Sequence, residues 1–260
     1  MPELPEVERY RRLAESAALG RRIVDVDAGD AWILKGGASA ADLRGALIGR
    51  SFTAARRRGK LLLLDTVGGP TLGLHFGMTG RLDVDGVVGD RLRHAPVDRQ
   101  DRWDRFALAF AGGGHLRLQD PRRLGGVHLD PDEERLGPDA ATVSVADLTA
   151  ALSGSSVALK GRLMDQRRLA GVGNLIADEI LWRAGLSPLR PARSLQPEEI
   201  RRLQRALRRG LAVLMARGGA HTGDLGPERR PGGRCPRDGT PLRRDTVGGR
   251  TTWWCPVHQR

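Results

Sequence analysis

The pattern of apolar residues changes once along this chain, and the change limits the folds open to it. From about residue 21 to 130, short apolar or alternating runs recur between glycine-rich breaks. Runs of this length and period predict β-strands. We expect strands at 22–26, 60–66, 71–76, 105–110 and 115–119. Short strands with turns between them are typical of an antiparallel sandwich or barrel.

Helical spacing of apolar residues marks the two flanks of this region. Residues 5–19 read as an amphipathic helix closed by Gly20. After an acidic stretch with two prolines, further helices are predicted at 148–152, 157–163, 175–184 and along a longer segment that ends at Gly218. The sequence therefore predicts an α+β chain, in which an N-terminal helix and an antiparallel β-sandwich precede a helical domain.

Domain boundaries follow from the same pattern. We expect a first domain at 1–130, a hinge at 131–143, a helical domain at 144–219 and a polar tail at 220–260. The tail is rich in Gly, Arg and Pro and is too polar to form a core of its own. It is therefore either disordered or held by something else.

The charge balance favours an anionic polymer as partner. The 260 residues include 43 Lys and Arg against 31 Asp and Glu, which gives a formal net charge of +12. Nearly all of the basic residues are Arg, and the lysines are Lys35, Lys60 and Lys160. No apolar run approaches the roughly 18 residues of a membrane span, so we expect no membrane partner.

The first seven residues, MPELPEV, place an amine beside a carboxylate. Removal of Met1 would leave Pro2 as a free secondary amine, followed directly by Glu3. Such an amine can attack an electrophilic carbon while the carboxylate moves protons. The alternative is an ordinary helix start, with Pro5 in the first turn and acidic residues near the positive end of the dipole. The segment lacks a basic leader and an apolar core, so we expect no export and an intracellular, reducing compartment.

A glycine-rich turn leads into the predicted helix at 175–184. Gly171 and Gly173 permit a tight turn, and Asn174 is expected as the N-cap of the helix. Backbone N–H groups that face outward there would suit a DNA phosphate. The alternative is a capped helix without a ligand.

These motifs together resemble the formamidopyrimidine-DNA glycosylase and endonuclease VIII family of DNA repair glycosylases. The N-terminus MPELPEVE is similar to that family's signature, and residues 165–188 resemble its helix–two-turn–helix. Residues 57–63 resemble its lysine-bearing strand, residues 75–80 and 120–125 its two base-stack loops, and the C-terminus its zinc finger. The matches follow the family's order and span nearly the whole chain.

The resemblance implies a bifunctional DNA glycosylase and apurinic/apyrimidinic lyase that acts on double-stranded damaged DNA. Pro2 would attack C1′ of the damaged nucleotide, expel the base and form an iminium that permits β/δ-elimination. Glu3 would move protons at the sugar, and Glu6 would lie near the flipped nucleotide. Lys60, Asn174 and Arg250 would clamp phosphates around the lesion. For Lys60, the alternative is a solvated strand end.

Four further residues receive DNA-binding roles from the resemblance. Met78 would fill the gap left by the flipped base, and Arg122 would bond the orphaned partner base. Leu124 stands where the formamidopyrimidine branch usually has Phe, and loses aromatic stacking. Lys160 resembles a family lysine near the DNA, although a solvated helix charge would explain it equally. For Met78, the alternative is a core position.

The resemblance also predicts a structural zinc ion at the C-terminus. Its ligands would be Cys235, Asp238, Cys255 and His258, with Asp and His at two of the four positions. The alternatives are a hairpin without zinc or a three-ligand site without Asp238. In each case the hairpin would present Arg250 to DNA.

Through MPELPEVE and Met78, the resemblance favours oxidised purines, such as formamidopyrimidine or 8-oxoguanine, as the substrate class. The segment 220–234 is shorter than the loop that covers oxidised purines in many family members, which keeps oxidised pyrimidines open as the substrate. The sequence also leaves open a protein that binds damaged DNA without catalysis, and a general basic nucleic-acid binder. We expect a cytoplasmic, nucleoid-associated monomer.

Overall fold

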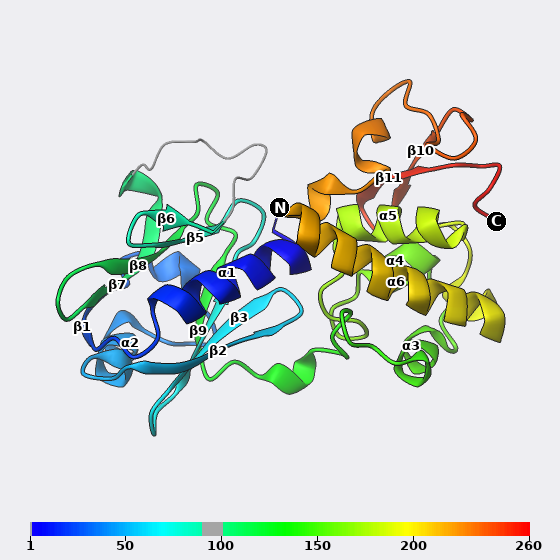
Figure 1. The fold of residues 1–260 in the computed structure, drawn as a ribbon. Helices are drawn as coiled ribbons and strands as arrows, with labels where there is room; N and C mark the ends of the chain where they lie inside the picture. Colours follow the sequence, from blue (N-terminus) through cyan, green and yellow to red (C-terminus); the bar gives the residue numbers. More distant parts are fainter. Residues whose placement is uncertain (1, 90–100) are drawn as a thin grey trace. The chain divides into compact units, whose positions relative to one another are not determined.

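The computed structural model describes residues 2–89 and 101–260, and it divides into two compact units (Figure 1). The first unit takes in Pro2 and Glu6–Glu133, and the second takes in Glu3–Pro5 and Glu134–Arg260. The division after Glu133 falls within the stretch predicted as a hinge. Glu3, Leu4 and Pro5 belong with the C-terminal half, although they lie at the start of the chain.

Two antiparallel sheets form the frame of the first unit. One sheet has the strand order β1-β7-β8-β5-β6, and the other has the order β2-β3-β4-β9. The strands of the first are β1 (Ile23–Asp27), β5 (Arg81–Val84), β6 (Val87–Val88), β7 (Asp104–Phe110) and β8 (His115–Gln119). Those of the second are β2 (Phe52–Arg58), β3 (Leu61–Thr66), β4 (Thr71–His75) and β9 (Gly126–Leu129). The predicted α+β class with antiparallel sheets is confirmed.

Helices cover this sheet frame. The first unit holds α1 (Leu4–Ala17), whose first two residues belong to the second unit, α2 (Ala40–Leu47) and the 3-10 turns η1 (Ala31–Ile33) and η2 (Asp101–Trp103). The 3-10 turn η3 (Glu133–Arg135) spans the division between the two units. The core contains Tyr10 from α1, Leu43 from α2 and the inward side chains of both sheets. Sequence periodicity did not predict α2, β2, β5, β6 or β9.

The second unit is mainly helical. Its helices are α3 (Val145–Leu152), α4 (Leu159–Leu163), α5 (Asn174–Ala184) and α6 (Pro197–Arg217), with 3-10 turns η4 (Ala192–Ser194), η5 (Ala220–Thr222) and η6 (Gly226–Glu228). α5 and α6 pack side by side, and α6 buries Leu203, Leu207, Leu211 and Leu214 along one face (Figure 1). Gly218 ends α6 in the left-handed region, at φ 96°.

The polar tail is ordered against the helices. Strands β10 (Arg243–Val247) and β11 (Arg250–Trp254) form an antiparallel hairpin that packs on α5. A small buried cluster of Trp182, Leu225, Cys235 and Cys255 fixes the rest of the tail. The tail is therefore held by α5, which was one of the two predicted outcomes. Across the part of the chain that the structure describes, no helix is both long and apolar enough to cross a membrane.

Candidate active site and metal cluster

The carboxylate of Glu3 lies at the N-terminus of α5. Glu3 is fully buried, and its two carboxylate oxygens accept hydrogen bonds from the backbone N–H groups of Leu175 at 2.8 Å and Ile176 at 3.1 Å. These N–H groups have no partner within the helix, and the positive end of the helix dipole favours an anion there. The contact fixes the residue next to Pro2 within the second unit.

This contact changes the predicted role of Asn174. The N-cap of α5 is Gly173, and Asn174 is the first helical residue. The two first-turn N–H groups predicted to face a phosphate are occupied by Glu3. The Asn174 side-chain oxygen is buried and has no hydrogen-bond partner in the described structure. The N–H groups of Leu175 and Ile176 are already engaged within the protein.

The other two residues of the N-terminal motif are also shielded from solvent. Pro2 is buried, and the predicted loss of Met1 lies outside the described residues. Glu6, in the first turn of α1, is 1% exposed and belongs to the first unit. Carboxylates are rarely buried unless they are paired, so the burial of two of them within seven residues is unusual.

Lys60 lies in the turn between β2 and β3, not within a strand as predicted. The turn needs Gly59, which has φ 58°. The paired positions Leu61 and His75 bring Lys60 close to the end of β4. Partial desolvation lowers the pKa of His75 to about 4, and the positive charge of Lys60 contributes to that shift. The His75 imidazole beside Lys60 is therefore favoured in its neutral form.

Two loops of the first unit present the side chains predicted to enter the DNA stack. Met78 and Leu124 are 42% and 45% exposed, and Arg122 is exposed as well. The backbones of the two loops touch, because a Cβ on Gly77 would lie 2.4 Å from the carbonyl carbon of Leu124. Exposed apolar side chains at adjoining loop tips are suited to insertion between bases, and the core position considered for Met78 is wrong.

A buried carboxylate that the sequence did not single out holds these loops together. Asp120 is fully buried, and its Oδ2 accepts from the N–H groups of Leu124 and Gly125, each at 2.7 Å. Its Oδ1 accepts from the Thr79 hydroxyl at 2.5 Å and from the Arg122 N–H at 3.1 Å. In the sequence, Asp120 stands between the end of an apolar strand and Pro121, and this pattern indicates a turn.

Lys160 is placed where a phosphate contact would not be expected. Its side chain is fully buried, and its ammonium lies 2.7 Å from Asp178 Oδ1 and donates to Thr251 O and to the Thr252 hydroxyl. Burial lowers the pKa of Lys160, and the Asp178 carboxylate opposes that shift. Neither of the predicted roles, a DNA contact or a solvated helix charge, agrees with this position. The lysine joins α4 and α5 to β11.

Arg250 is exposed at the turn of the β10–β11 hairpin, where Gly248 and Gly249 adopt positive φ. The neighbouring segment 220–234 is tied down through α5. Arg229 pairs with Asp178 at 2.9 Å, and the Glu179 carboxylate accepts from the backbone of residues 224 and 225. The hairpin turn therefore projects Arg250 from a well-braced base.

Four potential metal ligands meet at the other end of the hairpin. The ligand atoms of Cys235, Asp238, Cys255 and His258 all lie within 4.8 Å of one another. His258 Nδ1 is 3.3 Å from Cys235 Sγ, while its Nε2 is 3.0 Å from the carbonyl oxygen of Trp182. A proton on Nε2 would leave Nδ1 free as a ligand, as in many metal sites. The donor set fits a metal ion.

The chain matches two domain families in succession. Residues 1–127 match the formamidopyrimidine-DNA glycosylase N-terminal domain, and residues 136–224 match the formamidopyrimidine-DNA glycosylase H2TH domain. The chain belongs to the formamidopyrimidine-DNA glycosylase family. The resemblance inferred from the sequence motifs is thereby confirmed.

Relatives and solved structures cover the whole chain. The formamidopyrimidine-DNA glycosylase of Thermus thermophilus is 39% identical over 100% of this chain and 98% of its own length. That of Alkalilimnicola ehrlichii is 37% identical over 100% of both chains. The crystal structure of MutM (Fpg) from Thermus thermophilus matches with a TM-score of 0.81 at 35% identity, over 99% of this chain and 98% of that one. A Lactococcus lactis Fpg complexed with DNA containing an abasic site matches with a TM-score of 0.83 at 26% identity, over 99% of both chains.

Proposed function

We propose that this protein is a bifunctional DNA glycosylase and apurinic/apyrimidinic lyase that removes oxidised bases from double-stranded DNA. The observation that carries the proposal is the anchoring of Glu3 on α5, directly after Pro2. Family membership supports the reaction class, and the solved relatives include complexes with damaged DNA. The formal charge of +12 suits the polyanionic substrate.

The reaction begins when the secondary amine of Pro2 attacks C1′ of the flipped nucleotide. A bond forms between the Pro2 nitrogen and C1′, and the bond from C1′ to the base breaks. The electron pair leaves with the base, which takes up a proton. The attacking amine gives up its proton, and cleavage of the C1′–O4′ bond, with a proton taken up by O4′, opens the sugar and leaves an iminium between Pro2 and C1′. The iminium withdraws electrons, so loss of a C2′ proton expels the 3′ phosphate and cleaves the strand.

Glu3 serves this reaction best as a fixed anion. Two backbone N–H donors stabilise its negative charge. Such a carboxylate can stabilise positive charge on the sugar and accept a proton from it. We assign Glu6 a supporting role, and Lys60, Asn174 and Arg250 the phosphate contacts.

The loops held by Asp120 would act while the base is out of the stack. Met78 and Leu124 would fill the vacated space, and Arg122 would bond the orphaned base. The N-terminal motif and Met78 favour oxidised purines. The short segment 220–234, pinned by Arg229 and Asp178, favours oxidised pyrimidines as the second candidate, because a pinned short loop can cover less of a flipped purine.

A structural zinc ion is part of the proposal. Two thiolates, an imidazole and a carboxylate are all known zinc ligands, and the reducing cytoplasm that we propose for this protein would keep the thiols available. When bound, zinc would fix the base of the hairpin that carries Arg250. We further propose that the protein acts as a monomer on nucleoid DNA.

Borohydride trapping tests the proposed function. Three duplexes are compared, with 8-oxoguanine opposite cytosine, an oxidised thymine or an abasic site. A covalent adduct that maps to Pro2 is expected, and the lesion that traps best identifies the substrate class. Pro2→Gly should abolish the adduct. Tight binding without any adduct would identify a protein that recognises damage but does not repair it.

A further inference from the structure

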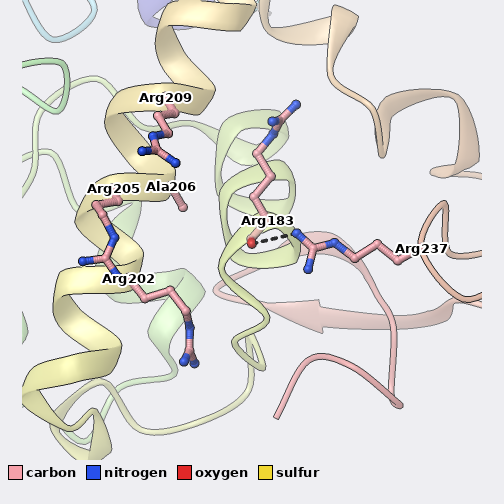
Figure 2. Close-up of a pocket in the computed structure, with 6 residues that line it drawn as sticks. All are labelled: Arg183, Arg202, Arg205, Ala206, Arg209 and Arg237. Carbon is pink, nitrogen blue, oxygen red and sulfur yellow. Dashed lines mark hydrogen bonds between the residues drawn. The ribbon is translucent and has the colours of Figure 1, made fainter.

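Five arginines surround one hollow of about 250 Å³ in the second unit (Figure 2). Arg202, Arg205 and Arg209 extend from α6, Arg183 comes from α5 and Arg237 comes from the loop between two of the potential metal ligands. The sixth lining residue is an alanine, so no acidic side chain lines the hollow. The sequence motifs did not single out any of these arginines.

Three of the arginines are held in place by neighbouring groups. Arg237 donates to the carbonyl oxygen of Arg183 at 3.0 Å, and its guanidinium lies 5.1 Å from the centroid of the Trp182 ring. Arg202 Nε donates to the carbonyl oxygen of Ala184 at 2.7 Å. Arg183 is bound by the carboxylates of two acidic neighbours. A guanidinium has five donors, so Arg202 and Arg237 keep others for a ligand in a largely fixed geometry.

The other two arginines of this hollow, Arg205 and Arg209, form a ridge on α6 together with Arg208, which does not line the hollow. We define the ridge as Arg205, Arg208 and Arg209. All three are exposed, and a second hollow of about 370 Å³ lies against the same three side chains. Within the described structure, neither Arg208 nor Arg209 makes an ion pair or hydrogen bond. Like charges three or four residues apart destabilise a helix by about 0.2–0.5 kcal/mol per pair. A bound polyanion would remove this cost.

The chemistry of the ridge favours a phosphate backbone over other anions. The exposed large apolar residues of the described chain all lie off α6. A protein partner would ordinarily need such an apolar anchor, and a nucleotide base would need an exposed aromatic face. Guanidinium groups bind phosphate through paired N–H donors, without any apolar contact. The outer edge of a DNA duplex presents phosphates and no exposed base, so it fits this surface.

The ridge lies away from Asn174 and Arg250, the two lesion-contacting residues assigned in the second unit. Asn174 begins α5 and Arg183 lies in its last turn, which separates them by about 13 Å along the axis. Arg250 begins β11, whereas Arg237 lies at the other end of the same hairpin, beside the four potential metal ligands. Asp178 contacts Trp253, and Trp182 contacts His258, so α5 and β11 run in the same direction. Asn174 and Arg250 thus lie at the starting ends of α5 and β11, and the hollow lined by Arg183 and Arg237 lies toward the opposite ends.

We propose that the ridge and the adjoining hollow bind the backbone of a second DNA segment while the active site holds the damaged one. This inference rests on the proposed function for the identity of DNA as the partner. It gives the protein a means to pass directly from one duplex to another, because a second contact can form before the first is released.

The test uses protein trapped covalently on a lesion duplex, so that the lesion site is already filled. A labelled, undamaged duplex is then added, and its binding is measured by fluorescence anisotropy at several salt concentrations. The ridge variant is Arg205→Ala/Arg208→Ala/Arg209→Ala, which places strong helix formers on an exposed face and should fold. Arg12→Ala/Arg193→Ala/Arg201→Ala removes the same charge elsewhere.

We expect trapped wild-type protein to bind the second duplex, with the three ridge arginines contributing about −2.7 to the logarithmic salt slope. The ridge variant should bind at least about tenfold more weakly, and the charge-matched variant should resemble the wild type. Failure to trap any lesion duplex would be a failure of the proposed function instead. Trapping without second-duplex binding would overturn the inference.

Three other outcomes would also overturn it. An equal loss in the charge-matched variant would show that net charge alone attracts the second duplex. Weaker binding of the first, lesion-bearing duplex by the ridge variant would assign the ridge to the lesion contact. Displacement of the undamaged duplex by a polyglutamate peptide at a lower concentration than by unlabelled duplex would identify an acidic protein as the occupant.

Discussion

The carboxylate of Glu3 occupies the space that a side chain on Gly173 would need. A Cβ on Gly173 would lie 2.3 Å from Glu3 Cδ. The backbone of Gly173 is extended, at φ −116° and ψ −164°, a conformation open to any residue. The glycine is therefore required by the approach of the carboxylate to α5, and the N-terminal motif and the glycine-rich turn act as one structural feature.

Gly173→Ala should displace Glu3 and impair base excision more than it impairs folding. We expect a loss of about 1–3 kcal/mol in unfolding free energy, as for other overpacked sites, and a rate of excision lowered at least about tenfold. Urea unfolding and single-turnover excision measure the two effects. Gly45→Ala in α2 is the matched control, because nothing lies within 4 Å of its Cβ. Unchanged excision in Gly173→Ala would show that the position of Glu3 is unimportant.

The link between Glu3 and α5 also shows where sequence reasoning ends. Local spacing identified five strands of the first unit, β1, β3, β4, β7 and β8, with β8 at the predicted bounds. It named Asn174 as the cap of α5, because Asn is a favoured capping residue. The actual partner of the first-turn N–H groups lies 172 positions earlier in the chain than Leu175. A pairing of that range leaves no trace in local periodicity.

Lys160 and β2 show two other limits. Lys160 was assigned a DNA contact from the family resemblance, with a solvated helix charge as the alternative, but Asp178 compensates its charge in the interior from a different helix. β2 was missed because its sequence, FTAARRR, alternates poorly and ends in three arginines. Pairing with the apolar strand β3 stabilises it instead. In both cases a non-local partner overrides the local preference.

Asp120→Asn should loosen the loops that carry Met78 and Leu124. An amide group would face two backbone N–H donors that now share one carboxylate oxygen, and an unsatisfied buried donor costs about 1–3 kcal/mol. We expect slower base flipping, measured by stopped-flow fluorescence of 2-aminopurine beside the lesion. Thr79→Val removes one hydrogen bond to the same carboxylate and should have a smaller effect. Equal flipping rates in Asp120→Asn and wild type would contradict the role of Asp120.

Substitution of Lys160 should lower stability, whereas substitution of Lys60 should weaken DNA binding. Lys160→Met leaves the buried Asp178 without one of its two cationic partners, which should cost about 3–5 kcal/mol of unfolding free energy. Lys60→Met, at a partly exposed turn, should change stability by less than about 0.5 kcal/mol while weakening lesion binding. Thermal unfolding and equilibrium DNA binding of both variants check the contrast. A stable Lys160→Met variant with weakened DNA binding would instead support a direct contact between Lys160 and DNA.

His75 reports the charge of Lys60. Because its pKa in the fold is about 4, below the ordinary value of 6.5, the neutral ring is favoured in the native state. The corresponding stability is fully present above pH 6.5 and is lost as the pH falls toward 4. Water screens part of the effect at this partly exposed ring, so we expect less than about 1 kcal/mol. NMR titration should show the pKa of His75 rising in Lys60→Met, and rising less in Lys35→Met.

Asp238→Cys should strengthen metal binding at the base of the hairpin. A third thiolate replaces a carboxylate oxygen, and zinc in structural sites is bound mostly by Cys and His. We expect zinc affinity to rise at least about tenfold, which corresponds to about 1.4 kcal/mol. Competition with a chromophoric chelator measures the affinity. Ser16→Cys, which adds an exposed thiol on α1, controls for non-specific binding. If neither wild type nor Asp238→Cys retains one zinc ion per chain, the hairpin keeps its shape through Lys160, Arg229 and the small apolar cluster alone.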